Sequence, residues 1–145
     1  MAVSTTQSIW RSGGGDQTRQ AYCGSGLMAA QFYIADASAS ANVKVSSAAG
    51  AANLVLPAGA VVTSVIITDA GSGSVDLGVS GTAAAIANGL DVSAVGTISV
   101  GSAVTGTALT STATITTASD TAGSGTVGGY LLYFVVDPLT GQQSV

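Results

Sequence analysis

From Leu27 onward, short runs of β-forming residues alternate with turn-forming residues, and this spacing constrains the fold more than any other feature. Each run is rich in Val, Ile, Thr or Tyr, and a turn signal containing Gly, Pro, Asn or Asp follows about every ten residues. We expect eight strands, at residues 27–35, 42–46, 53–56, 61–68, 74–79, 96–100, 107–117 and 126–136. The predicted fold class is all-β, an antiparallel β-sandwich that is jelly-roll-like, with a small barrel as the alternative.

Local residue patterns also make predictions about three connecting or flanking segments. Residues 69–73 are rich in turn formers and are expected to join 61–68 and 74–79 as a hairpin. Residues 82–88 are alanine-rich, so we allow one or two helical turns there, closed by Asn88-Gly89. In 107–117 the residues alternate, with the apolar positions facing inward and four threonines forming a solvated or laterally packed face.

The last run, 126–136, is apolar on both faces of the predicted strand. Tyr130, Leu132, Phe134 and Val136 point one way, and Leu131, Tyr133 and Val135 point the other way. One face must pack on the domain core, and the other needs cover from an arm, a second sheet or another subunit. We assign Leu131, Tyr133 and Val135 to a subunit interface, with the alternative that the tyrosines cap the core.

The composition argues against most kinds of active or binding site. More than half of the 145 residues are Ala, Gly, Ser or Thr, only 7% are charged, and the net charge is −4. Three basic residues give no surface that could neutralise nucleic-acid phosphates, so we expect no nucleic-acid partner. The sequence contains no His, which is the commonest general base and metal ligand. We therefore expect no cofactor, no metal and no catalytic residues, and predict that the chain is not an enzyme.

Two groups of the sequence are candidates for chemistry, the pair Asp69 and Asp76 and the thiol of Cys23. Asp69 and Asp76 flank the predicted hairpin turn and could approach each other, but turn chemistry at Asp69 and a strand-end position at Asp76 explain them more simply. Cys23 has no His to activate it as a nucleophile. Neither group changes the prediction.

Residues 1–24 differ from the rest of the chain. They contain both arginines and the only Trp, and they lack apolar periodicity. The alternatives are a disordered terminus and an extended arm that docks on a partner. Because Trp and Arg are common anchors in interfaces, we assign Trp10, Arg11 and Arg19 to an N-terminal arm (1–24) that precedes a sandwich domain (25–145).

Nothing in the sequence indicates export or membrane insertion. Met1–Trp10 is polar and has no apolar signal-peptide core, and the longest apolar run, Tyr130–Val136, is far shorter than the roughly 20 residues that span a bilayer. We expect synthesis in a cytoplasm, no membrane partner and a reduced thiol at Cys23.

Four segments resemble small structural proteins of tailed bacteriophages, the capsid decoration (cement or head-stabilising) proteins. Residues 54–67 carry a Pro-x-Gly-x-x-Val turn that leads into an apolar strand, and Asp76-Leu77-Gly78 follows in the next strand. A loop with an Asp and a closing Gly spans 88–96, and 129–136 is similar to the final strand of the family. The resemblance covers roughly residues 50 to 137.

This resemblance implies a virion protein on the capsid exterior, with the major capsid protein and copies of itself, as a homotrimer, as its partners. Its arm and its subunit interface would bridge neighbouring capsid subunits and so stabilise the shell. The alternative is a phage head or tail fibre, or another surface recognition module that binds carbohydrate. Because sugars usually stack on exposed aromatic rings and only 5% of the residues are aromatic, the composition favours the decoration protein.

Overall fold

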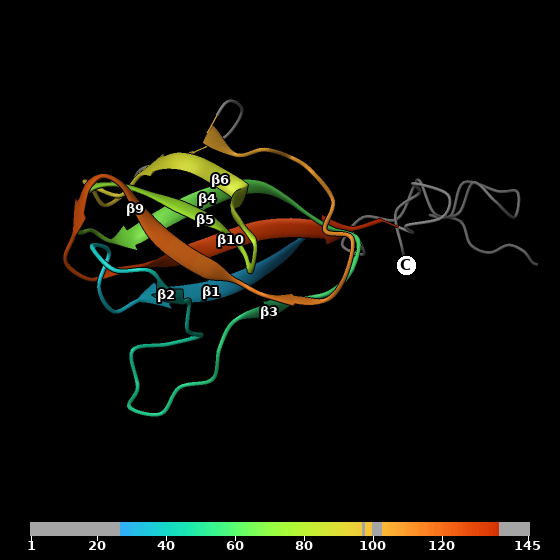
Figure 1. Cartoon of the computed structure of the whole chain (residues 1–145), viewed down its shortest axis with the longest axis horizontal. Coiled ribbons are helices and arrows are strands. Elements are labelled where there is room, and N and C mark those ends of the chain that lie inside the picture. Colours follow the sequence, from blue (N-terminus) through green and yellow to red (C-terminus); the bar gives the residue numbers. More distant parts are fainter. Residues whose placement is uncertain (1–26, 97, 100–102, 137–145) are drawn as a thin grey trace, which may run out of the picture.

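The structure is a computed structural model that describes residues 27–96, 98–99 and 103–136. Within these residues it contains ten β-strands and no α-helix (Figure 1). The strands are β1 (Met28–Ile34), β2 (Ala41–Asn42), β3 (Val55–Leu56), β4 (Ala60–Asp69), β5 (Ser72–Val79), β6 (Thr82–Asp91), β7 (Ile98–Ser99), β8 (Ala113–Thr114), β9 (Thr116–Ser124) and β10 (Val127–Val135).

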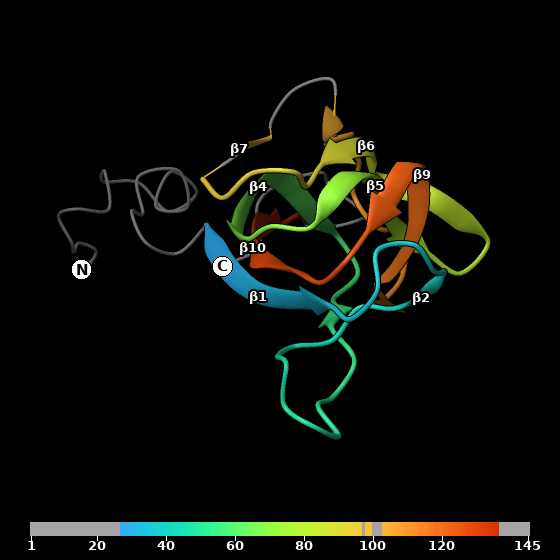
Figure 2. The ribbon, with the colours of Figure 1, turned by 90° about the vertical axis from the view of Figure 1, so that its left-hand side faces the viewer.

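The long strands form two four-stranded sheets in the described part of the chain. The first sheet has the order β1-β10-β4-β7 and the second has the order β2-β9-β5-β6, while β3 and β8 form a separate pair. Figure 2 shows the two sheets side by side as two layers. All strand pairs are antiparallel, which confirms the predicted all-β sandwich.

The pairing of the strands is nested along the chain. β1 pairs with β10, β2 with β9, β3 with β8, β4 with β7 and β5 with β6. The described chain is therefore one long two-stranded ribbon that folds back at the turn between β5 and β6. Two further pairings, β10 with β4 and β9 with β5, join the wound ribbon into the two sheets.

The hydrophobic core lies between the two sheets. Phe32, Val65 and Leu131 come from the first sheet, and Leu77 and Leu90 come from the second, each with an exposed fraction of 1% or less. They belong to one continuous cluster of buried side chains. Burial of such side chains contributes roughly 1.5–3 kcal/mol each, which is how a chain with so few large residues is held together.

The hairpin predicted across residues 69–73 is wrong. β4 belongs to the first sheet and β5 to the second, so this segment is a corner that carries the chain from one layer to the other. Gly73 has a φ of +71°, and a side chain there would collide with the backbone oxygens of Thr121 and Ala122. Turn residues predict a change of direction, but not whether the next strand pairs with the previous one or crosses to another sheet.

The helical turns predicted at residues 82–88 are also wrong, because this segment lies within β6. A tight turn at Ser80-Gly81, with Gly81 at a φ of +85°, brings β6 back along β5. Ile86 and Ala87 are both buried. So short an alanine-rich stretch has little intrinsic helical stability, and strand pairing and burial outweigh it.

The strand predicted at residues 107–117 is only partly present. Residues 105–112 form no strand, and the pairing begins with β8 and continues in β9. Leu109, Ile115 and Thr117 are buried, as the alternation predicts, whereas Ser111 on the same predicted face is exposed. The inward pattern therefore holds only where the backbone packs against the core.

Candidate functional site

The structure fixes which face of β10 is covered by the domain itself. Leu131 pairs with Val65, and both side chains have an exposed fraction of 0%. Tyr133 packs against the core, and Val135 pairs with Ala60, which is buried. Leu131 is therefore a core residue and is not accessible to another subunit, whereas Tyr133 and Val135 are half-buried and their assignment to a subunit interface stays a prediction.

The opposite side of β10 forms the outer surface of the first sheet. Six apolar side chains on three adjacent strands share this surface, which we call the β10 face: Ala29, Val61, Ile66, Tyr130, Leu132 and Phe134. Tyr130 has an exposed fraction of 39%, and Leu132 and Phe134 are half-buried. The sequence shows two apolar faces on this strand but not which of them packs on the core, because a shift of one residue moves every side chain to the other face.

The register of the sheet makes the β10 face continuous. Tyr130 lies between Gln31 of β1 and Ile66 of β4. In the next row Leu132 lies between Ala29 and Ser64. Side chains opposite each other in an antiparallel pair are about 5 Å apart, so these rows are in contact across the strands.

Most charged side chains of the described residues lie away from this face, but Asp69, at the end of β4, pairs with Gly128 of β10 and borders it beside the row of Tyr130. Asp76, Asp91 and Asp120 belong to β5, β6 and β9 of the second sheet, and Asp36 lies in the loop after β1. Lys44, the one cation of the described residues, donates a hydrogen bond from Nζ to Oδ1 of Asn53 at 2.7 Å. That bond closes the base of the β2–β3 connection, which extends away from the sandwich in both views (Figure 1, Figure 2).

Two of the carboxylates form local turns. Ser38 donates both its hydroxyl (2.6 Å) and its backbone N–H (2.9 Å) to Oδ1 of Asp36. Ser93 does the same for Asp91, at 2.6 and 2.9 Å. These bonds lower the pKa of both carboxyl groups, since they stabilise the charged form. Both groups therefore stay ionised at neutral pH, and each stabilises its turn by accepting hydrogen bonds from the residue two positions later.

The two carboxylates predicted to flank one turn lie in different sheets. Asp69 is exposed at the end of β4, whereas Asp76 lies inside β5 and accepts a hydrogen bond from the backbone N–H of Gly89 at 2.9 Å. Thus Asp76 is not a strand-end residue. No cluster of three or more His, Cys, Asp or Glu that could hold a metal is found among the described residues.

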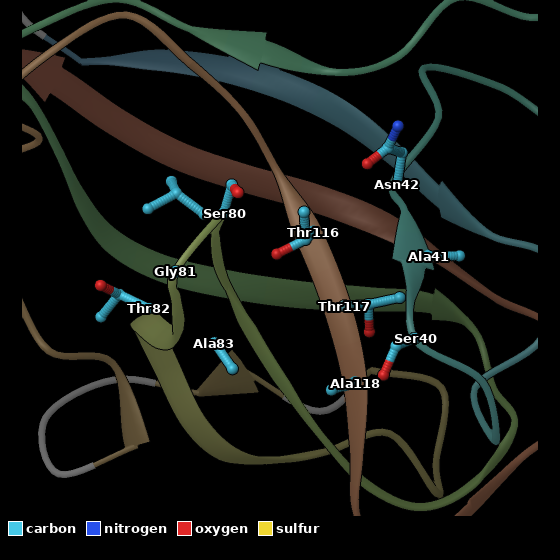
Figure 3. Close-up of a pocket in the computed structure, with 11 residues that line it drawn as sticks. Ser40, Ala41, Asn42, Ser80, Gly81, Thr82, Ala83, Thr116, Thr117 and Ala118 are labelled. Atoms are coloured by element: carbon cyan, nitrogen blue, oxygen red, sulfur yellow. The ribbon is translucent and has the colours of Figure 1, made fainter.

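A groove of about 450 Å³ lies at one end of the second sheet. Its walls are β2, the start of β9 and the turn between β5 and β6 (Figure 3). It is lined by Ser40, Ala41, Asn42, Val79, Ser80, Gly81, Thr82, Ala83, Thr116, Thr117 and Ala118. Oγ1 of Thr117 is buried without a hydrogen-bond partner, which is the feature of this groove that the sequence did not indicate. The lining has neither a charged nor an aromatic side chain, so it offers hydrogen bonds but no stacking platform.

The predicted arm residues Trp10, Arg11 and Arg19, and also Cys23, lie outside the described residues. Their assignment stays a prediction. Within the described ranges, no helix has the length and apolar character needed to span a bilayer.

Comparison with known proteins gives this chain no relatives. No protein-family model, no curated protein and no solved structure matches it.

Proposed function

We propose that this chain is a structural protein of a tailed-bacteriophage particle, a decoration protein that binds the outside of the major capsid shell. The observation that carries the proposal is the β10 face, which presents six apolar side chains on three strands and is bordered by the carboxylate of Asp69. Contiguous apolar surfaces of this kind mark association sites on soluble domains. A structural role by association therefore fits the described residues better than a chemical one.

The topology supports the same proposal. A two-stranded ribbon wound into two four-stranded sheets fits a jelly roll, an architecture of eight strands and two Greek keys that viral capsid domains use. Because a fold alone does not define a function, the topology adds to the surface argument and does not replace it.

In the proposed mechanism, each copy stabilises the shell by touching several capsid subunits at once. Trp10, Arg11 and Arg19 are the proposed anchors of an arm that reaches a neighbour. Individually weak contacts then add through effective concentration, so that a shell carrying many copies resists internal DNA pressure.

The test is binding to shells of the parent phage that lack this chain. We expect the purified chain to bind them in hundreds of copies per shell and to raise the temperature at which they disrupt. The variant with Trp10→Ala and Arg11→Ala should bind at least tenfold more weakly, whereas Lys44→Ala, a change of cation outside the arm, should bind normally. Absence of binding at micromolar concentration would contradict the proposal.

The groove beside β2 favours a second candidate, a fibre or surface recognition module that binds carbohydrate. The exposed Ser, Thr and Asn side chains of the lining could bond to sugar hydroxyls. Glycan-array binding that is lost in Thr82→Val, together with failure to bind shells, would favour this candidate over the first. Because the groove has no aromatic side chain on which a sugar could stack, carbohydrate binding is the weaker of the two candidate functions.

A further inference from the structure

We propose that, in the free chain, residues 1–26 cover the β10 face of their own domain. In this contact Trp10 lies on the apolar side chains beside Tyr130, and Arg19 pairs with the carboxylate of Asp69. The inference goes beyond the proposed function, because it concerns the chain before it binds a shell.

One carboxylate of the described residues has no partner there. Four of the five described aspartates accept hydrogen bonds from other groups of the chain: Asp36, Asp76, Asp91 and Asp120. Asp69 is exposed, and within the described residues its carboxylate has neither such a bond nor an ion pair. Asp69 is therefore the carboxylate that is free to receive a cation.

Asp69 lies where a cation would sit beside the apolar side chains. It pairs with Gly128 of β10, which pairs in turn with Tyr33 of β1. A Cβ built on Gly128 would lie 3.3 Å from that of Asp69, so both side-chain directions share one side of the sheet. Tyr130 follows two residues after Gly128, on the same side of the strand. A segment that carries both an apolar ring and a cation can therefore contact Tyr130 and Asp69 together.

Charge and composition select the occupant. Residues 1–26 contain the only Trp and two of the three basic residues of the chain. The described residues contain five aspartates and one lysine, whereas residues 1–26 contain two arginines and one aspartate, so the two parts carry opposite net charge. The third cation, Lys44, already donates a hydrogen bond to Asn53. Charge complementarity therefore favours an arginine of residues 1–26 as the partner of Asp69.

The point where residues 1–26 join the domain allows this contact. Leu27 is 57% exposed and directly precedes β1, the neighbour of β10. Five residues along β10 and two strand spacings separate the start of β1 from Asp69, a distance of about 20 Å. Arg19 precedes Leu27 by eight residues, which extend over about 26 Å, so it can reach Asp69. The run Gly13-Gly14-Gly15 can bend the chain so that Trp10 returns along the face.

A tethered segment needs less contact area than a separate molecule. Three strands at a spacing of about 4.8 Å and the nine residues of β10 give this face roughly 420 Å². Stable complexes bury about 800 Å² on each partner. A short flexible connection gives an effective concentration in the millimolar range, so a weak contact forms within one chain before it forms between two molecules. Binding to a shell then frees the arm to reach a neighbour.

The test is the fluorescence of Trp10 in the full chain, because no other Trp contributes to it. We expect an emission maximum at a shorter wavelength than that of the chain in urea, and quenching by acrylamide that is at least twofold weaker. Both should stay constant between about 1 and 100 µM, since the contact lies within one chain.

Variants locate the contact. Tyr130→Asp should give the emission and quenching of the unfolded chain, and Asp69→Asn should do so in part, because an exposed ion pair contributes less than the apolar contact. Asp69→Arg should weaken the contact further, and the added change Arg19→Asp should restore it. The matched control is Val55→Asp, because Val55 is 50% exposed in β3, outside both large sheets, and should keep the wild-type emission. Circular dichroism and melting temperature establish that each variant is folded.

Four results would overturn the inference. Trp10 could be quenched as strongly as in urea, Tyr130→Asp and Val55→Asp could have equal effects, or the charge exchange between Asp69 and Arg19 could fail to restore protection. A signal that grows with concentration would mean that Trp10 binds another molecule. Because none of these measurements uses shells, shell binding with an exposed Trp10 in the free chain contradicts this inference alone, and a protected Trp10 without shell binding contradicts the proposed function alone.

Discussion

The two sheets of this sandwich share a core but present opposite kinds of outer surface. The first sheet exposes apolar side chains around Tyr130. On the second sheet, Asp76, which pairs with Ala118, and Ser74, which pairs with Asp91, face outward, and the inner positions between them are buried. The polar groups there satisfy one another, as in the 2.8 Å hydrogen bond from Oγ of Ser74 to Oδ2 of Asp120.

This difference shows what each surface is suited for. A sheet whose outer polar groups are bonded to each other and to water needs no partner. A sheet that exposes a continuous apolar face gains free energy when that face is covered. The comparison therefore favours the first sheet as the site of the proposed association, whereas the outer face of the second sheet is suited to contact with solvent.

The largest difference in stability should be found between substitutions at two neighbouring residues of β10, one on its core side and one on the β10 face. Leu131→Ala should lower the free energy of unfolding by about 2–5 kcal/mol, because it leaves a cavity among fully buried side chains. Its neighbour Leu132 is half-buried on the outer side, so Leu132→Ala should cost at most about 1.5 kcal/mol. Urea denaturation at a concentration where the chain is monomeric measures both. Equal losses would mean that the two faces of β10 are not as different as described.

The corner that joins the sheets provides the second test. Gly73→Ala should destabilise by about 2 kcal/mol or more, since Gly73 has a positive φ and a Cβ there would meet backbone oxygens of β9. The matched control is Gly81→Ala, which has a similar φ of +85° but no atom within 4 Å of the added Cβ. It should cost only about 1 kcal/mol. Similar losses for the two alanines would argue against the close approach of the corner to β9.

The polar bonding of the second sheet can be tested at Asp76. Asp76→Ala removes the acceptor for the backbone N–H of Gly89 and should lower the free energy of unfolding by about 1–2 kcal/mol. Asp69→Ala, at the exposed end of β4, should change it by less than about 0.5 kcal/mol. Thermal unfolding of the two variants in the same buffer gives the comparison. A larger loss at Asp69 would contradict the structural role given to Asp76.

The smallest expected effect is on how the free energy of unfolding changes at acid pH. The folded-state pKa values of Asp36 and Asp91 lie below their ordinary value, so both groups contribute stability that is present above pH 4 or so and is lost as the pH falls through the folded pKa. Asp91→Asn should therefore make stability less dependent on pH between about 2 and 5. Ser93→Ala, which removes the hydroxyl donor, should reproduce part of this change. An unchanged acid profile in both variants would contradict the turn bonding described for Asp91.

Where the sequence predictions failed, competing interactions at particular residues explain the failure. Residues 82–88 looked helical because alanine favours helices locally, but pairing with β5 and burial of Ile86 decide the outcome. Residues 69–73 carry turn chemistry that is compatible with a hairpin and with a corner, and only the packing of Gly73 against β9 distinguishes them. The groove at Thr117 had no signal in the sequence, because its residues come from three separate segments.

The sequence by itself determined that this chain is all-β, that only 7% of its residues are charged and that its last strand is apolar on both sides. These properties follow from local periodicity and composition, which need no knowledge of distant contacts. Only the tertiary structure decided that Leu131 faces the core and Tyr130 faces outward. Because both faces of β10 are apolar, its sequence is compatible with either face packing on the core. Which face does so depends on how its neighbours β1 and β4 are oriented against the second sheet.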